Sequence, residues 1–403
     1  KLSTEINRRS SLFQQNLSKL SSLTQEVFSG IRVIKAYTLE ERQKEEFREL
    51  SEESKEKNLS LAVVNALFGP LMILLIGLSN LIVVYIGGMM YIDSSIPNLG
   101  VIAEFIIYIN MLTWPVASIG WVSSLVQEAE ASQKRINEFL NIEPEIQNPS
   151  EEDFTVEGTI EFKNVSYTYE DTGIKALENI SFKVNQGETL AILGKTGSGK
   201  STILSLISRL YDTSEGEVSI DGRPIQTVNL NRLRAQTGVV PQDPFLFSDT
   251  IKNNIKFGKE DASDEEVTTA AQKADVHHNI MDFPKQYETV LGERGITLSG
   301  GQKQRVSIAR ALIKDPKIYL FDDCLSAVDT ETEERILNHL LESSANKTTL
   351  IVSHRVSSAK NADRIIVLDN GQIIQQGTHN QLIEVDGLYK ELFQKQLFEK
   401  ELQ

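Results

Sequence analysis

The sequence predicts two regions of different fold class: an α-helical membrane segment, followed by an α/β domain built on a mainly parallel sheet. Two long, almost uncharged stretches between residues 58 and 127 indicate the membrane segment. Beyond residue 154, short apolar runs of strand character alternate with helical stretches, which is the pattern of a sheet covered by helices. A chain of 403 residues is long enough for two or more such regions.

The net charge and the cysteine count limit which partners and which cellular compartment are expected. The net charge of -15 argues against nucleic acid as a partner, because binding a phosphate backbone requires a concentrated basic face. The single cysteine, Cys324, permits no internal disulfide and no multi-cysteine metal site, so we expect a core residue in a reducing cytosol. The chain opens at Lys1 inside a helical pattern, without Met or a cleavable apolar segment, and is expected to be truncated at its N-terminus.

Two transmembrane helices are expected, over residues 59–92 and 99–127. The first stretch has no charged side chain and the second has only Glu104, and each is long enough to cross the hydrocarbon core. The loop over residues 93–98 has no Lys or Arg, whereas both outer flanks do, so the positive-inside rule places the outer ends in the cytosol. Buried helices of a soluble protein are the alternative for each span.

The segments around the spans are polar. Residues 1–57 predict long charged helices with a break at Gly30. The apolar side chains within residues 31–37 interrupt this pattern and indicate a contact patch on a cytosolic loop. The expected organisation is a partial transmembrane domain over residues 1–140, a Glu-, Asn- and Pro-rich linker over 141–153, and a soluble domain over 154–403.

The soluble domain shows strand-like runs separated by helical stretches, which predicts the mainly parallel sheet. The apolar run over residues 189–193 is the most clearly bounded of these strands, because a glycine-rich loop follows it directly. The other expected strands cover residues 159–169, 180–184, 217–220, 238–240, 318–321, 348–352 and 364–368.

The glycine-rich loop leads into a helix expected over residues 202–210. Such a loop turns successive backbone N–H groups toward a polyphosphate at the positive end of a helix, which predicts a nucleoside triphosphate site of the P-loop NTPase type. Lys200 is expected to reach the terminal phosphates, and Ser201 to ligate Mg²⁺. The residues expected to line the triphosphate are Gly194, Lys195, Thr196, Gly197, Ser198, Gly199, Lys200, Ser201 and Thr202.

A second part of the site is expected at the end of the strand over residues 318–321. This apolar strand ends in Asp322 and Asp323, at the sheet edge where open α/β folds place their ligands. Asp322 is expected to hold Mg²⁺ through water beside Ser201.

The stretch Leu298–Gln302, followed by Lys303-Gln304-Arg305 and an amphipathic helix, resembles the signature motif of ATP-binding cassette (ABC) proteins. It lies between the phosphate loop and the acidic strand, as that family requires. The resemblance implies an ABC cassette with an antiparallel β subdomain and a helical subdomain. It also implies that two cassettes enclose two ATP molecules, each signature binding the γ-phosphate held by the partner. The signature residues assigned to ATP are Ser299, Gly300, Gly301 and Gln302.

The same resemblance implies roles for further residues. Tyr169 resembles the aromatic residue that stacks on adenine, with Tyr167 as the alternative. Gln242 resembles the glutamine that contacts Mg²⁺ and links the cassette to the membrane domain, and His354 resembles the switch histidine at the γ-phosphate. The implied catalytic set is Lys200, Gln242, Asp323 and His354, and the implied metal set is Ser201, Gln242 and Asp322. Glu293–Gly295 resemble a loop that contacts the coupling helices, and Ser326–Asp329 a segment that crosses to the other cassette.

Two spans joined to a following cassette resemble the last part of an MsbA-type lipid or multidrug exporter half, which has further spans ahead of them. This implies an ATPase in the cytoplasmic (inner) membrane with its cassette in the cytoplasm, working with a second half-transporter to export a lipid or hydrophobic drug. Residues 29–37 would match a coupling loop that docks on the opposite cassette.

Asp323 departs from the family pattern, which usually has Glu at this position. Its carboxylate is shorter by one methylene, so it retreats by about 1.5 Å, a displacement that can slow catalysis ~10²-fold. An identical pair that uses Asp and a weakly hydrolysing half of a heterodimer both remain open. The alternative from another class is a soluble ABC ATPase of DNA repair or translation, with residues 61–126 as buried helices.

Overall fold

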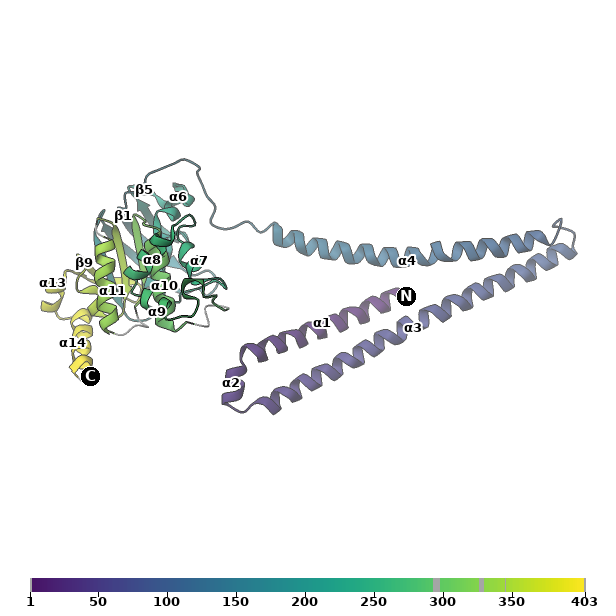
Figure 1. Cartoon of the computed structure of the whole chain (residues 1–403). Coiled ribbons are helices and arrows are strands. Elements are labelled where there is room, and N and C mark those ends of the chain that lie inside the picture. The colour runs from purple at the N-terminus through teal and green to yellow at the C-terminus, as the bar shows by residue number, and fades with distance from the viewer. Residues whose placement is uncertain (1, 293–297, 326–329, 345, 402–403) are drawn as a thin grey trace. The chain divides into compact units, whose positions relative to one another are not determined.

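The computed structural model describes residues 2–292, 298–325, 330–344 and 346–401. The chain forms two compact units, residues 1–143 and residues 144–403 (Figure 1). The predicted segments Glu293–Gly295 and Ser326–Asp329 lie outside the described residues.

The first unit is entirely helical. It contains α1 (Leu2–Ser29), α2 (Ile31–Ala36), α3 (Glu40–Ile92) and α4 (Gly100–Leu140). Helices α3 and α4 form a long hairpin, and α1 packs along α3 (Figure 1). The guanidinium of Arg9 on α1 donates to the backbone oxygen and the hydroxyl of Ser60 on α3, at 2.9 and 2.6 Å, which ties the two helices together.

The apolar surface of α3 is exposed. Among the described residues, α3 is the one helix long and apolar enough to cross a membrane, and none of its most apolar stretch is buried. Ile73 and Leu81, for example, are 72% and 67% exposed. Gly100–Val116 in α4 is a shorter apolar stretch. A soluble protein would bury such a surface, so the structure favours contact with lipid or with other membrane helices.

The second unit contains two sheets. The antiparallel sheet has the order β2-β1-β4-β5, and the larger sheet has the order β10-β9-β3-β8-β7-β6, in which only β10 is antiparallel to its neighbour. This confirms the predicted mainly parallel sheet with an antiparallel subdomain. The strands are β1 (Ile160–Thr168), β2 (Lys175–Val184), β3 (Thr189–Gly194), β4 (Glu215–Ile220), β5 (Arg223–Pro224), β6 (Thr237–Val240), β7 (Ile318–Asp322), β8 (Thr348–Ser353), β9 (Arg364–Asp369) and β10 (Gln372–Gly377).

Helices cover both faces of the parallel sheet. Because side chains alternate along a strand, Leu190 and Ile192 of β3 enter one hydrophobic core, and Ala191 and Leu193 enter another. A third core lies under the helical subdomain. The helices are α5 (Lys200–Ile207), α6 (Leu230–Ala235), α7 (Ile251–Lys256), α8 (Asp264–Lys273), α9 (His277–Met281), α10 (Gly300–Ile313), α11 (Thr330–Ser343), α12 (Val356–Ala359), α13 (His379–Glu384) and α14 (Leu388–Glu401), with 3-10 turns at Ile225–Thr227 and Gln286–Glu288.

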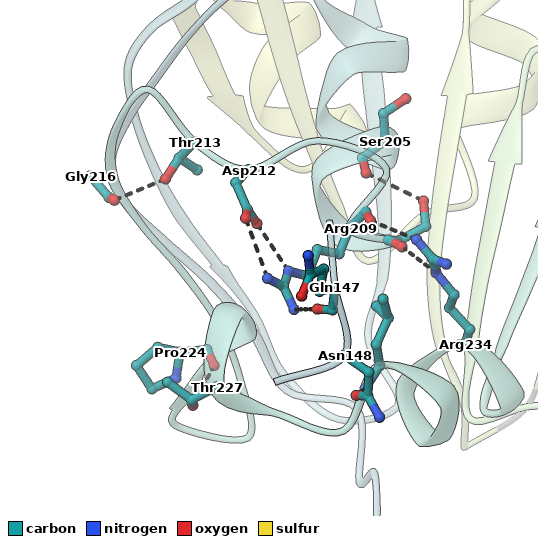
Figure 2. A network of polar contacts seen from close by, with 12 residues as sticks. Gln147, Asn148, Ser205, Arg209, Asp212, Thr213, Gly216, Pro224, Thr227 and Arg234 are labelled. Carbon is teal, nitrogen blue, oxygen red and sulfur yellow. Dashed lines mark hydrogen bonds and ion pairs between the residues drawn. The ribbon is translucent and has the colours of Figure 1, made fainter. Parts of the chain in front are cut away.

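The expected linker is attached to the cassette at its C-terminal part. Figure 2 shows Arg209, just after α5, between Asp212 and the backbone oxygen of Gln147. The guanidinium donates to Asp212 at 3.0 and 3.3 Å and to the Gln147 oxygen at 3.3 Å. The amide oxygen of Asn148 accepts from the backbone N–H of Leu230, at the start of α6, at 2.8 Å. Residues 147 and 148 are therefore fixed on the surface of the cassette.

Candidate functional site

Parallel strand order brings the predicted site residues to one edge of the large sheet. Strand β3 pairs with β8, β8 pairs with β7, and β7 pairs with β6, all in parallel. The carboxyl ends of these strands therefore meet at the same edge, where open α/β sheets bind ligands. The phosphate loop, the acidic pair, His354 and Gln242 each follow one of these four strands.

The phosphate loop requires glycine where it approaches other parts of the backbone. Gly199 has a φ of +96°, and a Cβ on it would lie 2.4 Å from the backbone oxygen of Ala176. A Cβ on Gly194 would lie 2.3 Å from the backbone oxygen of Leu368. Around Gly197, at a φ of +80°, no heavy atom lies within 4 Å of such a Cβ, so this glycine faces open space. The loop is held closely at its two ends and is open in the middle.

Lys200 is folded back into the loop. Its ammonium donates to the backbone oxygens of Gly194 and Lys195, at 2.9 and 2.6 Å. Burial lowers its pKa, although Asp323 and Asp322 favour its charge. The hydroxyl oxygen of Ser198 is buried without a hydrogen-bond partner among the described residues. A buried polar atom without a partner is costly, and a phosphate oxygen would supply that partner, so the loop fits a triphosphate.

The acidic strand end meets the start of α5. The hydroxyl of Ser201 donates to Oδ1 of Asp322 at 2.9 Å, which joins β7 to the phosphate loop. Burial raises the pKa of Asp322, and the hydrogen bond from Ser201 opposes that rise. A hydroxyl and a carboxylate side by side are the hard oxygen ligands that Mg²⁺ prefers.

Asp323 faces His354 across the strand ends. Its Oδ2 lies 3.1 Å from Nε2 of His354, and its backbone N–H donates to the oxygen of Val352 at 2.9 Å. The backbone of Asp323 has a φ of +44°, a conformation that Asp tolerates better than most residues. Burial raises the pKa of Asp323, and the charge of His354 opposes the rise. The structure thus brings together two of the predicted catalytic side chains.

Tyr167 and Tyr169, the two candidates for adenine stacking, differ in burial. Tyr167 is 7% exposed and belongs to the core, whereas Tyr169 is only partly buried. The hydroxyl of Tyr169 lies 3.1 Å from Oγ1 of Thr202, on the helix that follows the phosphate loop. Tyr211 contacts both tyrosines, and a groove of about 480 Å³ borders all three rings. This placement favours Tyr169 over Tyr167 for adenine stacking, which stays a prediction.

Gln242 lies on an exposed loop just after β6. Its backbone oxygen accepts a 3.5 Å hydrogen bond from the side chain of Gln304 on α10. Among the described residues, no hydrogen bond joins its side chain to Ser201 or Asp322, so its metal role stays a prediction.

The signature forms the start of α10. Ser299 is the N-cap: its hydroxyl accepts from the backbone N–H of Gln302 at 3.3 Å, while the Gln302 side chain accepts from the Ser299 N–H at 3.0 Å. This capping box leaves Gly300 and Gly301 in the first helical turn, where N–H groups have no helical partner. Within the part of the chain that the structure describes, no hydrogen bond joins this motif to the phosphate loop of the same chain.

A buried carboxylate behind the site, Glu333, was not predicted from the sequence. Glu333 on α11 is 2% exposed and accepts from the guanidinium of Arg355 at 2.5 Å and from the hydroxyl of Ser358 at 2.5 Å. Arg355 follows His354 directly, so this ion pair anchors the loop that carries His354, called the switch loop below. Glu333 lies among several acidic residues of a helix, and no sequence pattern distinguishes it from the others.

Comparison with known proteins agrees with this architecture. Residues 3–116 match the ABC transporter transmembrane region, and residues 177–326 match the ABC transporter family. A probable multidrug resistance ABC transporter ATP-binding/permease protein, YheI of Bacillus subtilis (strain 168), is 40% identical over 98% of this chain and 67% of its own length. The multidrug resistance-like ATP-binding protein MdlA of Escherichia coli (strain K12) is 39% identical over the same shares.

A solved structure of a known exporter is similar to this chain. A bacterial Atm1-family ABC exporter with ATP bound matches with a TM-score of 0.88 and 31% identity, over 98% of this chain and 70% of that one. These findings confirm the predicted ATP-binding cassette, its ATPase activity and its export function, and a membrane protein with a cytoplasmic cassette. The transmembrane match excludes the soluble ATPase of DNA repair or translation. The chain therefore belongs to the ABC transporters, as a half-transporter of the exporter type.

Proposed function

We propose that this chain pairs with a second half-transporter in the cytoplasmic membrane and exports a hydrophobic drug or lipid by hydrolysing Mg²⁺-bound ATP at sites shared between two cassettes. One observation carries the proposal: Ser201–Asp322 and Asp323–His354 meet at 2.9 and 3.1 Å on one sheet edge. The signature, by contrast, caps a separate helix. Each chain thus offers the sheet edge to one shared site and the signature to the other.

The residues on the sheet edge divide the work of binding. The backbone N–H groups of the phosphate loop and the Ser198 hydroxyl receive phosphate oxygens. Lys200 exchanges its two carbonyl partners for the terminal phosphates, and the ion pair that forms favours its charged state. Ser201, Asp322 and Gln242 would hold Mg²⁺, and the ion when bound would neutralise charge on the phosphates.

Asp323 and His354 act on the attacking water. The Asp323 carboxylate accepts a hydrogen bond from that water and orients it, while His354 donates to the γ-phosphate from the other side. Their 3.1 Å contact keeps both side chains within reach of one reacting centre. Catalysis here is positioning and charge stabilisation, since the chain supplies no covalent nucleophile to the phosphate in this scheme.

The partner completes the site with its own Ser299, Gly300 and Gly301. A capped helix start whose first N–H groups have no helical partner binds an anion, and among the described residues no hydrogen bond joins it to the phosphate loop of the same chain. Closure of the two cassettes on ATP then moves the loop around α2, whose Val33 and Tyr37 are 58% and 73% exposed. The exposed apolar faces of α3 and α4 suit a hydrophobic or amphipathic cargo, and YheI and MdlA carry multidrug resistance in their names.

Nucleotide-dependent cross-linking tests the shared site. Two differently tagged full-length copies carry Lys195→Cys and Ser299→Cys, respectively, and Cys324 stays in place because it is buried. We expect a disulfide between the copies with ATP and none without it. If identical copies fail to cross-link but Lys195→Cys cross-links to a co-purified second chain, the partner is a different half-transporter. If neither pair responds to ATP while ATPase activity persists, the shared site is wrong.

A further inference from the structure

The loop that carries His354 is held from the C-terminal helix. The side-chain oxygen of Gln396, on α14, accepts from the backbone N–H of Val356 at 2.8 Å. The amide nitrogen of the same side chain donates to the backbone oxygen of His354 at 3.1 Å. Only one orientation of the amide satisfies both bonds, because a backbone N–H needs an acceptor and a backbone oxygen needs a donor. Gln396 therefore brackets the loop on both sides of Arg355.

The helix that presents Gln396 is well anchored. Tyr389 is fully buried near the start of α14, and its hydroxyl lies 2.6 Å from Nδ1 of His379. Leu392 and Phe393 pack against the core that contains Val356. Residues seven apart share one face of a helix, so the face that carries Tyr389 into the core also turns Gln396 toward the switch loop.

The other side of the loop is also fixed. The hydroxyl of Ser353 accepts from the backbone N–H of Arg355 at 3.0 Å, and Glu333 holds the Arg355 guanidinium. With the side chain of Arg355 bound to α11 and the backbone of His354 bound to α14, the imidazole projects toward Asp323 from a fixed base. Loss of the Gln396 amide leaves the His354 oxygen and the Val356 N–H without these partners and loosens the histidine backbone on that side.

We propose that Gln396 is a positioning residue for His354, so that the C-terminal helix sets the rate of ATP hydrolysis without touching the nucleotide. The inference rests on the function proposed above for His354. A displacement of the order of 1 Å in a catalytic group can slow a reaction ~10²-fold, so a partly released loop lowers the turnover number. ATP affinity depends on the phosphate loop, and among the described residues no hydrogen bond joins Gln396 to that loop.

The test compares two glutamines of α14 in the full-length transporter with its partner, reconstituted in lipid nanodiscs. Gln396→Ala is expected to lower kcat for ATP about tenfold while KM for ATP changes less than about twofold, the signature of a lost transition-state interaction. Gln396→Glu keeps the acceptor for the Val356 N–H and loses the donor to the His354 oxygen. Its kcat is therefore expected to lie between those of the wild type and Gln396→Ala. The matched control is Gln394→Ala, because Gln394 is exposed on the same helix. Its kcat is expected to equal that of the wild type.

A double-mutant comparison with His354→Ala distinguishes a positioning role of Gln396 from a purely structural one. In the His354→Ala background, Gln396→Ala is expected to cause no further loss, since the group through which it acts is gone. Equal fold-losses in both backgrounds, or a loss of thermal stability and of ATP affinity together with kcat, would overturn the inference. If His354→Ala abolishes turnover and Gln396→Ala has wild-type kinetics, the inference alone fails. If His354→Ala retains full turnover, the proposed role of His354 fails and the inference falls with it.

Discussion

Replacing Asp323 by Asn tests the central assignment of the catalytic site. Asn has the same size and keeps a side-chain oxygen, so the backbone at a φ of +44° and the approach to His354 are retained. The change removes the negative charge that polarises water. The contacts that hold the nucleotide, from Lys200 and from the Ser201–Asp322 pair, remain in place.

The expected loss follows from the role of the carboxylate. A positioned general base contributes about 10²- to 10⁴-fold, so kcat for ATP should fall by at least about 10²-fold. The affinity for ATP should change less than about threefold, because Lys200, Ser201 and Asp322 are all retained in the variant. The variant is expected to bind ATP and remain closed, so the disulfide between the Lys195→Cys and Ser299→Cys copies should still form when the oxidant is added after free ATP has been removed.

The assay is steady-state phosphate release by the reconstituted full-length transporter, with Asp323→Glu as the companion variant. Glu restores the longer side chain usual in the family, and its kcat is expected to equal or exceed that of the wild type by up to about 10²-fold. An Asp323→Asn variant with the turnover of the wild type would refute the reasoning, because hydrolysis would then use a base outside this chain's site. That outcome would instead support a weakly hydrolysing half of a heterodimer.

Three further predictions concern the loop, the aromatic and the linker. Gly199→Ala should weaken binding of a fluorescent ATP analogue at least about tenfold more than Gly197→Ala, because both glycines have positive φ but only a Cβ on Gly199 collides with the Ala176 oxygen, at 2.4 Å; equal losses would contradict this. Tyr169→Ala should raise KM for ATP about tenfold through loss of about 1–3 kcal/mol of stacking, whereas Tyr169→Phe should leave it unchanged; an unaffected KM in the alanine variant would remove Tyr169 from the adenine site. Arg209→Ala should lower the free energy of unfolding by about 3 kcal/mol in a denaturant titration, since it breaks a largely buried ion pair, and a loss below about 1 kcal/mol would mean that the linker contact contributes little.

The candidate site was predictable where its chemistry is local. The glycines, Lys200 and Ser201 follow one another in the chain, because a loop that wraps a triphosphate must present consecutive N–H groups. Asp322 ends an apolar strand, so its place at the sheet edge followed from parallel pairing alone. The contact of Ser201 with Asp322, across more than a hundred residues, agrees with that expectation.

The local sequence also explains why one strand and the ends of one helix were not predicted correctly. Strand β10 alternates between partly buried and exposed residues and lies at the edge of the large sheet, so its polar sequence has no continuous apolar run. The helix after the phosphate loop begins at Lys200 rather than at residue 202 and ends at Ile207 rather than at residue 210, because Arg209 leaves the helical conformation with a φ of +48°. That departure directs its side chain to Asp212 and the linker.

By itself, the sequence determined the order of a helical membrane segment and a nucleotide cassette, together with the identity of the phosphate-binding and acidic residues. Hydropathy and short motifs contain that information, since each depends on neighbours within a few positions. Tertiary structure alone decided which of two tyrosines is less buried, which carboxylate supports Arg355, and which glutamine of α14 holds the histidine loop. Glu333 and Gln396 act on a loop far away in the chain, and such contacts exist only once packing has brought α11 and α14 against it.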